Sequence, residues 1–401
     1  MIFVKTDDLK TGMRLARPVY NKNGVLLYER DSKLTYQGIT SIKNFGLIGI
    51  FVLEPAEPVP PMTEDDIYFE RFQTIYVFAI KEELDNILQT KRQAKMQSIT
   101  ANIIKNYGHL DRKIYFMQNL RSKEDYTYKH SLNVAMLCAM IAHTMNITVG
   151  EQLDTVTAAI VHDIGKLAAP KEVMMSDNWT ELEKGQIKAA EIAGFGIIEQ
   201  TFAVTPNIKR ICMQAQKNIE SLEKGEDVDN SKMIMGARIL SVAETFDTMT
   251  AMQIDKPPAS EVAALKYLMQ HPDYFDEKVV KALIDSVKIL FAGVSIELNT
   301  GEKGLVLSEN PVNVLKPMIL TYTDNKLIDL YSKEYDGKLE IVDIMKTMDN
   351  RHIVNRALME KFGIKPQEKT YTGASPSMEE QPSGEDNTQD GETEEYVPGA
   401  V

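Results

Sequence analysis

A histidine on the apolar face of a helix is the first residue in this sequence that could do chemistry. His130 is followed by Val134, Leu137 and Ile141 at i+4, i+7 and i+11, which is the spacing of one helix face. The imidazole is therefore expected to point inward with these side chains. A neutral imidazole nitrogen is a common ligand of divalent metals.

A carboxylate occupies a comparable position on the next helix. Leu153, Val156 and Ile160 share a stripe with Asp163, so this acidic side chain lies at the apolar face. An ionised carboxylate there is costly unless it is paired or bound to a metal. Asp163 therefore needs a partner, and His162 comes directly before it.

A third helix, expected over residues 231–252, carries two more carboxylates. Leu240, Glu244 and Asp247 stand at i, i+4 and i+7, which places both acidic residues on one face. We interpret Glu244 as part of a cation site. Asp247 is interpreted as a cap, or as the partner of Arg238 or of a neighbouring helix.

These residues suggest a cage for one hard or borderline divalent cation such as iron or manganese. His130, His162, Asp163 and Glu244 combine imidazole nitrogen with carboxylate oxygen, which such cations accept together. A bound ion would polarise a phosphoryl oxygen and generate hydroxide. Lys166 would neutralise phosphate charge, so Asp163 and Lys166 are the predicted catalytic residues.

A structural interpretation of the same residues stays open. The two histidines and their carboxylates can form a hydrogen-bond network that only holds three helices together. Lys166 can likewise be a solvated lysine at a helix end, favoured there by the helix dipole.

The sequence resembles the HD superfamily of metal-dependent phosphohydrolases and, within it, the HD-GYP proteins, which hydrolyse the bacterial messenger cyclic di-GMP. The similarity covers roughly residues 70 to 330 and is carried by residues 126–127, 130–134, 158–166, 237–247 and 275–280. It implies a helical HD fold, a metal-dependent phosphodiesterase activity and a tendency to self-associate. The segment before it resembles the small β-rich module often found ahead of such domains.

Several family features are replaced in this chain. Ala190 stands where the resemblance implies a histidine ligand, and residues 211–218 contain glutamines and Cys212 where it implies a histidine pair. The Gly-Tyr-Pro loop is missing, and Glu244 replaces an aspartate. Residues 253–256 replace an Arg-Pro-Tyr-Arg stretch, which leaves Lys256, with Lys166, as a predicted substrate-binding residue. A multinuclear metal site is therefore not expected, because alanine and glutamine are poor ligands.

The hydrophobic patterns predict a mainly α protein: an all-helical HD-GYP-like core with a small β-rich module before it and a small β appendage after it. We expect short strands at residues 2–4, 14–20, 25–28 and 48–53, with a helix at 36–45. A hairpin is expected at 294–298 and 305–307, and further strands at 318–321 and 327–330. The predicted parts are the N-terminal module (1–54), a proline-rich linker (55–66), the helical domain (67–290), the appendage with a short helix (291–362) and a disordered acidic tail (363–401).

The amino-acid composition limits the kinds of molecule that this protein is expected to bind. The formal net charge is −13, and the tail from Pro366 to Val401 accounts for most of it; no basic, aromatic-rich stripe appears, so no nucleic-acid partner is expected. No signal peptide or run of eighteen apolar residues is present, which predicts a cytoplasmic protein without membrane contact. Cys138 and Cys212 are expected to be small buried residues.

Two functions remain from different classes. We favour a degraded HD-GYP-like protein of cyclic di-GMP signalling that acts as a weak or inactive phosphodiesterase, sensing a ligand or docking a protein partner. The alternative is an active mononuclear-metal phosphohydrolase for cyclic di-GMP or another phosphate ester, with His130, His162, Asp163 and Glu244 as ligands.

Overall fold

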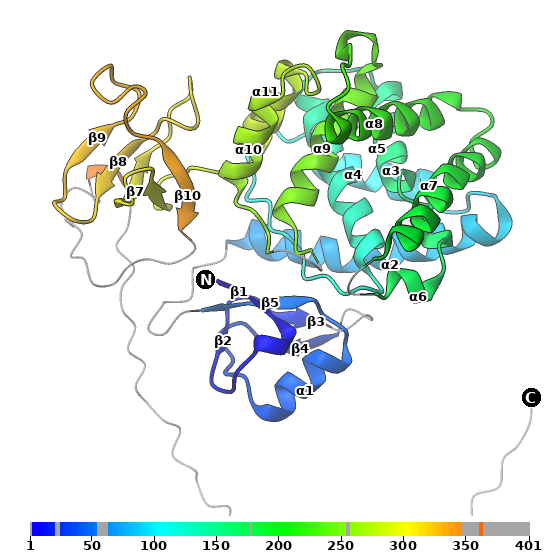
Figure 1. Cartoon of the computed structure of the whole chain (residues 1–401), viewed down its shortest axis with the longest axis horizontal. Coiled ribbons are helices and arrows are strands. Elements are labelled where there is room, and N and C mark those ends of the chain that lie inside the picture. The colour runs from blue at the N-terminus through cyan, green and yellow to red at the C-terminus, as the bar shows by residue number, and fades with distance from the viewer. Residues whose placement is uncertain are drawn as a thin grey trace, which may run out of the picture. The chain divides into compact units, whose positions relative to one another are not determined.

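The structure is a computed structural model that describes residues 2–20, 25–53, 63–176, 179–253, 257–345 and 361–363. Figure 1 shows a bundle of helices with small sheets formed by the N-terminal and C-terminal segments. The mainly α fold class is therefore confirmed. The α-helices are α1 (Tyr36–Asn44), α2 (Glu64–Thr90), α3 (Met96–Tyr107), α4 (Tyr126–Thr144), α5 (Val149–Val161), α6 (Lys171–Met174), α7 (Glu181–Thr201), α8 (Pro206–Lys224), α9 (Met235–Thr250), α10 (Glu261–Gln270) and α11 (Glu277–Ser286). Short 3₁₀ turns are η1 (Thr6–Asp8), η2 (Lys166–Ala168) and η3 (Asn230–Lys232).

Helix α4 is the centre of the bundle. It is buried along most of its length and packs against α2, α3, α5, α9 and α11. Capping boxes built from a threonine and an acidic residue three positions later begin α2, α5 and α7. One hydrophobic core runs through these helices and continues into the C-terminal sheet.

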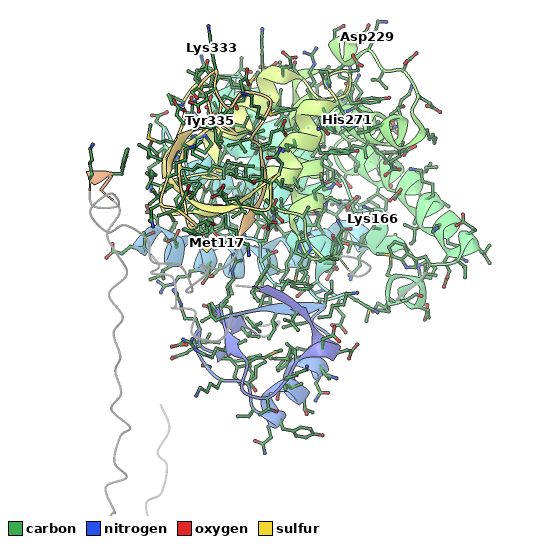
Figure 2. All side chains as sticks on the ribbon, turned by 60° about the vertical axis from the view of Figure 1, so that its left-hand side comes forward. Met117, Lys166, Asp229, His271, Lys333 and Tyr335 are labelled. Atoms are coloured by element: carbon green, nitrogen blue, oxygen red, sulfur yellow. The ribbon has the colours of Figure 1, made fainter. Side chains whose placement is uncertain are left out.

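Two small β regions flank the helices in sequence. The N-terminal strands are β1 (Ile2–Lys5), β2 (Arg14–Leu15), β3 (Val19–Tyr20), β4 (Leu26–Tyr28) and β5 (Gly49–Leu53); β1, β5 and β2 form an antiparallel sheet, and β3 pairs with β4. The C-terminal strands are β6 (Ser295–Leu298), β7 (Lys303–Ser308), β8 (Met318–Thr321), β9 (Leu327–Asp329) and β10 (Ile341–Met345), in the antiparallel order β10-β6-β7-β8-β9. Figure 2 shows Lys333 and Tyr335, which lie between β9 and β10, and His271 just after α10.

Two local predictions differ from the structure, and one strand was missed. The run at residues 14–20 forms two strands, because Pro18 lacks the N–H that a continuous ladder requires. β10 was not predicted, since its pairing partner β6 is more than forty residues earlier in the chain. The helix expected at 231–252 begins as η3, and α9 proper starts at Met235.

Other predictions lie outside the described residues: most of the proline-rich linker, most of the short C-terminal helix and nearly all of the acidic tail. The proposed domain boundaries therefore stay predictions. Among the helices that the structure does describe, none combines the length and apolar character needed to cross a bilayer.

The corner between α2 and α3 depends on a buried carboxylate. Glu83 is 1% exposed and accepts backbone N–H bonds from Ala94, Lys95 and Met96 at 2.7, 2.8 and 3.2 Å. The start of α3 has no cap from its own N-cap side chain, so Glu83 supplies the acceptors that these N–H groups need.

We expect Glu83→Gln to lower the free energy of unfolding by about 1–3 kcal/mol, because charge-assisted bonds to buried donors are weakened. Urea denaturation would measure the change. The matched control is Glu82→Gln: Glu82 is exposed and pairs with Lys95 at the surface, where ion pairs contribute little. Equal stability of the two variants would contradict this account of the corner.

Candidate metal centre

Three mutually packed helices bring the predicted ligands together. His130 lies in the second turn of α4, His162 and Asp163 follow the last residue of α5, and Glu244 lies in the third turn of α9. Each of these helices contacts the other two, so helix packing fixes the spacing of the four side chains. Leu153, expected to share the inward stripe of α5, is instead 38% exposed.

The turn after α5 holds Asp163 close to α7. The backbone N–H of Lys166 donates to the carbonyl of Asp163 at 3.0 Å, which keeps the turn tight. A β-carbon on Gly165 would collide with the carbonyl oxygen of Ala190, and one on Gly194 would lie 2.8 Å from the Gly165 Cα. Two glycines therefore allow the turn to pack directly on the backbone of α7.

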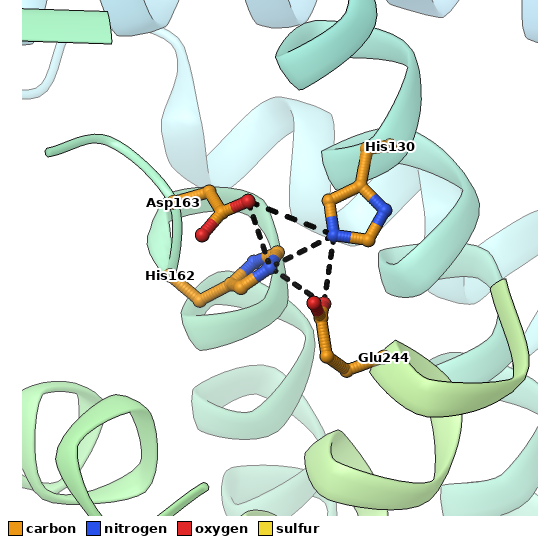
Figure 3. A group of neighbouring side chains, drawn as sticks. All are labelled: His130, His162, Asp163 and Glu244. Atoms are coloured by element: carbon orange, nitrogen blue, oxygen red, sulfur yellow. Dashed lines mark hydrogen bonds and ion pairs between the residues drawn. The ribbon is translucent and has the colours of Figure 1, made fainter. Parts of the chain in front are cut away.

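The four side chains converge, as Figure 3 shows. Glu244 Oε2 lies 2.7 Å from His130 Nε2 and 2.8 Å from His162 Nε2, and the two Nε2 atoms are 3.2 Å apart. Asp163 Oδ2 is 3.7 Å from each of these nitrogens. One ligand atom from every residue lies within 4.8 Å of the others.

The fields of these groups shift their pKa values in opposite directions. Burial alone would lower the pKa of His130, but the Glu244 and Asp247 carboxylates raise it well above its ordinary value. Burial would raise the pKa of Glu244, yet His130 and His162 hold it well below its usual range. The cluster is thus a set of mutually stabilised opposite charges in a site with little access to water.

The donor set fits one divalent cation. Two imidazole Nε2 atoms and two carboxylate oxygens face a common point, and all four residues are at least largely buried. This mixture of nitrogen and oxygen donors suits zinc, iron or manganese better than calcium or magnesium, which prefer oxygen alone. The sequence prediction that these four residues meet agrees with the structure; their role as ligands stays a prediction.

Asp247 contacts the other nitrogen of His130. Its Oδ2 lies 2.6 Å from His130 Nδ1, and the same carboxylate accepts hydrogen bonds from Arg121, Gln118 and Asn133. Burial opposes ionisation, but Arg121 and His130 hold the pKa of Asp247 at about 2. Of the alternatives expected for Asp247, contact with a neighbouring helix is confirmed, since His130 and Asn133 lie on α4, whereas pairing with Arg238 is wrong.

Arg238 pairs instead with Asp276 at the start of α11, at 2.9 Å. Sequence reasoning missed Arg121 and Gln118, because both lie in an irregular segment without a periodic pattern.

Lys166 lies beside the four-residue cluster. Its Nζ is 2.8 Å from Asp163 Oδ2 and 3.7 Å from Glu191 Oε1 on α7. Burial would lower the pKa of this ammonium, but Asp163 and Glu244 raise it, so Lys166 carries a positive charge at neutral pH. Its side chain is 30% exposed, which makes the charge accessible to a ligand. Lys166 is therefore neither fully solvated nor a metal ligand.

Where the resemblance implies further histidine ligands, the structure has residues that make other contacts or none. Gln214 Oε1 accepts the N–H of Ile234 just before α9, and Gln216 Nε2 donates to Glu191 Oε2 at 3.2 Å. Ala190 offers only a methyl group. Gln216 of α8 and Glu191 of α7 are thus hydrogen-bonded to each other, and the expected loss of metal ligands on this side stays a prediction.

The remaining candidates lie elsewhere. Lys256 is outside the described residues. His143 pairs with Asp111 at 2.9 Å on the surface, while Cys138 and Cys212 are buried and free, as predicted.

Comparison with known proteins gives one family and three curated relatives. Residues 115–279 match the HD domain family. A cyclic di-GMP phosphodiesterase of Pseudomonas aeruginosa is 20% identical over 259 residues, or 64% of this chain and 61% of that protein. A 3′3′-cGAMP-specific phosphodiesterase of Vibrio cholerae is 25% identical over 41% of this chain and 32% of its own length. A cyclic di-GMP phosphodiesterase of Borreliella burgdorferi is 22% identical over 51% and 55%.

The chain spans less than two thirds of the length of each of these relatives. The matched region nevertheless contains α4, α5 and α9, with every member of the four-residue cluster. Residues 115–279 match the HD domain family, and His130 meets the His162-Asp163 pair within them. This part of the chain is therefore an HD domain.

Proposed function

We propose that this chain is an HD protein of cyclic-dinucleotide signalling that holds one divalent metal and binds its ligand with slow or no hydrolysis. The observation that carries the proposal is the convergence of His130, His162, Asp163 and Glu244. The nearby carboxylate on α7, that of Glu191, is already paired with lysines and with Gln216. The names of all three relatives, which are phosphodiesterases of cyclic di-GMP or cGAMP, support a cyclic dinucleotide as the ligand class.

A metal held by these four residues would act as a Lewis acid toward a phosphoryl oxygen and lower the pKa of bound water. Asp163 would contribute one ligand oxygen, and the same carboxylate accepts a hydrogen bond from the Lys166 ammonium. Lys166 can donate to a phosphodiester oxygen, because its charge is fixed and its side chain is partly exposed. Binding of an anion therefore rests on this chain's own lysine as well as on the metal.

Hydrolysis is expected to be weak because a second ion lacks ligands. Ala190 has no donor, and the amide nitrogen of Gln216 faces Glu191. Glu191 is also occupied by Lys188 at 3.3 Å. The charge that develops on a phosphoryl group would be neutralised by one metal and Lys166 only.

The second candidate is an active mononuclear phosphohydrolase. It is favoured by the presence of all four donors together with Lys166 in one site. The two candidates differ in whether bound ligand is converted to product.

The metal content of the purified protein tests the metal site. Protein purified without added metal is expected to hold about one transition-metal ion per chain by elemental mass spectrometry, and His162→Ala is expected to lose it, because four donors become three. The matched control is His143→Ala, which removes a surface imidazole paired with Asp111. Metal-free wild type, or equal content in both variants, would contradict the metal site.

Turnover separates the two candidates. We expect calorimetry to show binding of cyclic di-GMP while chromatography finds little or no linear product. Metal-supported product formation that disappears in both His162→Ala and Asp163→Ala would contradict the slow or absent hydrolysis and establish the active phosphohydrolase.

Lys166→Met is expected to weaken binding of cyclic di-GMP at least about tenfold, since a hydrogen bond to a charged group contributes about 1.5–3 kcal/mol. Calorimetry measures the dissociation constant. Lys184→Met is the control, because Lys184 pairs with Glu181 at the surface of α7. Unchanged affinity in Lys166→Met would show that Lys166 does not contact the ligand.

A further inference from the structure

The segment from Gln118 to Ser122, which lies between α3 and α4, faces the metal centre with two side chains. Gln118 Nε2 donates to Asp247 Oδ1 at 3.0 Å. Arg121 is fully buried, and one of its terminal nitrogens donates to both oxygens of Asp247, at 2.8 and 2.6 Å. The position of the Asp247 carboxylate is thus set by this segment.

Asp247 in turn orients a candidate metal ligand. Its Oδ2 is 2.6 Å from His130 Nδ1, and both side chains are almost completely buried. A carboxylate on Nδ1 favours the imidazole tautomer that carries its proton there, which leaves the Nε2 lone pair for the metal. His130 Nε2 is the atom that faces His162 and Glu244.

The backbone of the same segment is bonded to the N-terminal strands. The Arg17 guanidinium donates to the carbonyl of Gln118. The N–H of Ile48 donates to the carbonyl of Arg121 at 3.0 Å, and Leu47 forms a β-bridge with Ser122. Side chains of the segment therefore point to Asp247 while its backbone is held by residues 17, 47 and 48.

The chain just after α9 packs against neighbouring N-terminal residues. Met252, two residues beyond α9, is fully buried in a cluster with Ala16, Phe51 and Leu53. Leu120 packs against this cluster too. The end of the helix that carries Asp247, and the segment that holds Asp247, thus both contact residues 2–20 and 25–53, called the N-terminal module below.

We propose that Asp247 is a positioning residue for His130, and that the N-terminal module sets the affinity of the metal centre by holding the segment from Gln118 to Ser122. The inference rests on the proposed function, because it concerns the same metal site. The module and the centre are connected by a series of contacts. Arg17 and Ile48 bind the backbone of Gln118 and Arg121. The side chains of those two residues hold Asp247, which contacts His130.

Titration with Co²⁺, followed by its visible absorption, tests both steps. Asp247→Asn keeps the shape of the side chain but removes its charge, and we expect its Co²⁺ affinity to fall about 10- to 100-fold, as for other partners of metal-bound histidines. Arg17→Met removes the donor to Gln118 and keeps an apolar stem beside Phe51; an affinity loss of a few-fold is expected, since the other module contacts remain.

Two control variants break comparable ion pairs elsewhere. Asp276→Asn removes the charge of the half-buried partner of Arg238, and Arg14→Met removes a partner of Asp31 inside the module. Both are expected to bind Co²⁺ like the wild type. Wild-type affinity in Asp247→Asn would overturn the positioning role, and wild-type affinity in Arg17→Met would overturn the coupling to the module.

A second readout is measured on the wild-type protein itself. In Zn²⁺-loaded wild type labelled with ¹⁵N-histidine, we expect the His130 resonance, assigned by its loss in His130→Gln, to report a protonated Nδ1 and a metal-bound Nε2. An unprotonated Nδ1 would overturn the role of Asp247. Failure of the wild type to bind either metal would instead contradict the proposed function itself, together with this inference.

Discussion

The rest of the site depends on the hydrogen bonds that the buried carboxylate of Asp247 accepts. An isolated charge at this depth would be very costly, so it exists only because Arg121, Gln118, Asn133 and His130 all donate to it. These donors come from α4 and from the irregular segment before it, while Asp247 belongs to α9. Satisfying one charge therefore fixes the relation of two helices and aims an imidazole at the centre.

On the side of α7 and α8, close backbone packing rather than a buried charge shapes the site. Small residues there allow close backbone packing, with Gly165 and Gly194 bringing the turn after α5 onto α7. The polar side chains of α7 and α8 then pair among themselves, as Gln216 does with Glu191. The four-donor cluster thus lies between buried charge pairs on one side and polar side chains that are already paired with one another on the other.

The sequence predicted the parts of the site that lie on regular helices. Helical spacing placed His130 inward and put Glu244 and Asp247 on one face, and the structure agrees. Periodicity could not find Arg121 or Gln118, because their segment is irregular and their partner is more than a hundred residues away. It also missed β10, whose pairing with β6 is long-range, and placed Leu153 inward although the start of α5 is at the surface. The local sequence pattern thus predicted which helix face a residue lies on, while tertiary contacts determined which residues it pairs with.

The measurement that tests the account most directly is anomalous diffraction from crystals of the protein grown with Mn²⁺. The account predicts one anomalous peak per chain, at bonding distance from His130 Nε2, His162 Nε2 and carboxylate oxygens of Asp163 and Glu244, with Lys166 and Glu191 still facing each other. Absence of a peak among these four residues would contradict a metal centre. A second peak on the α7 side of Asp163 would contradict the single-metal site.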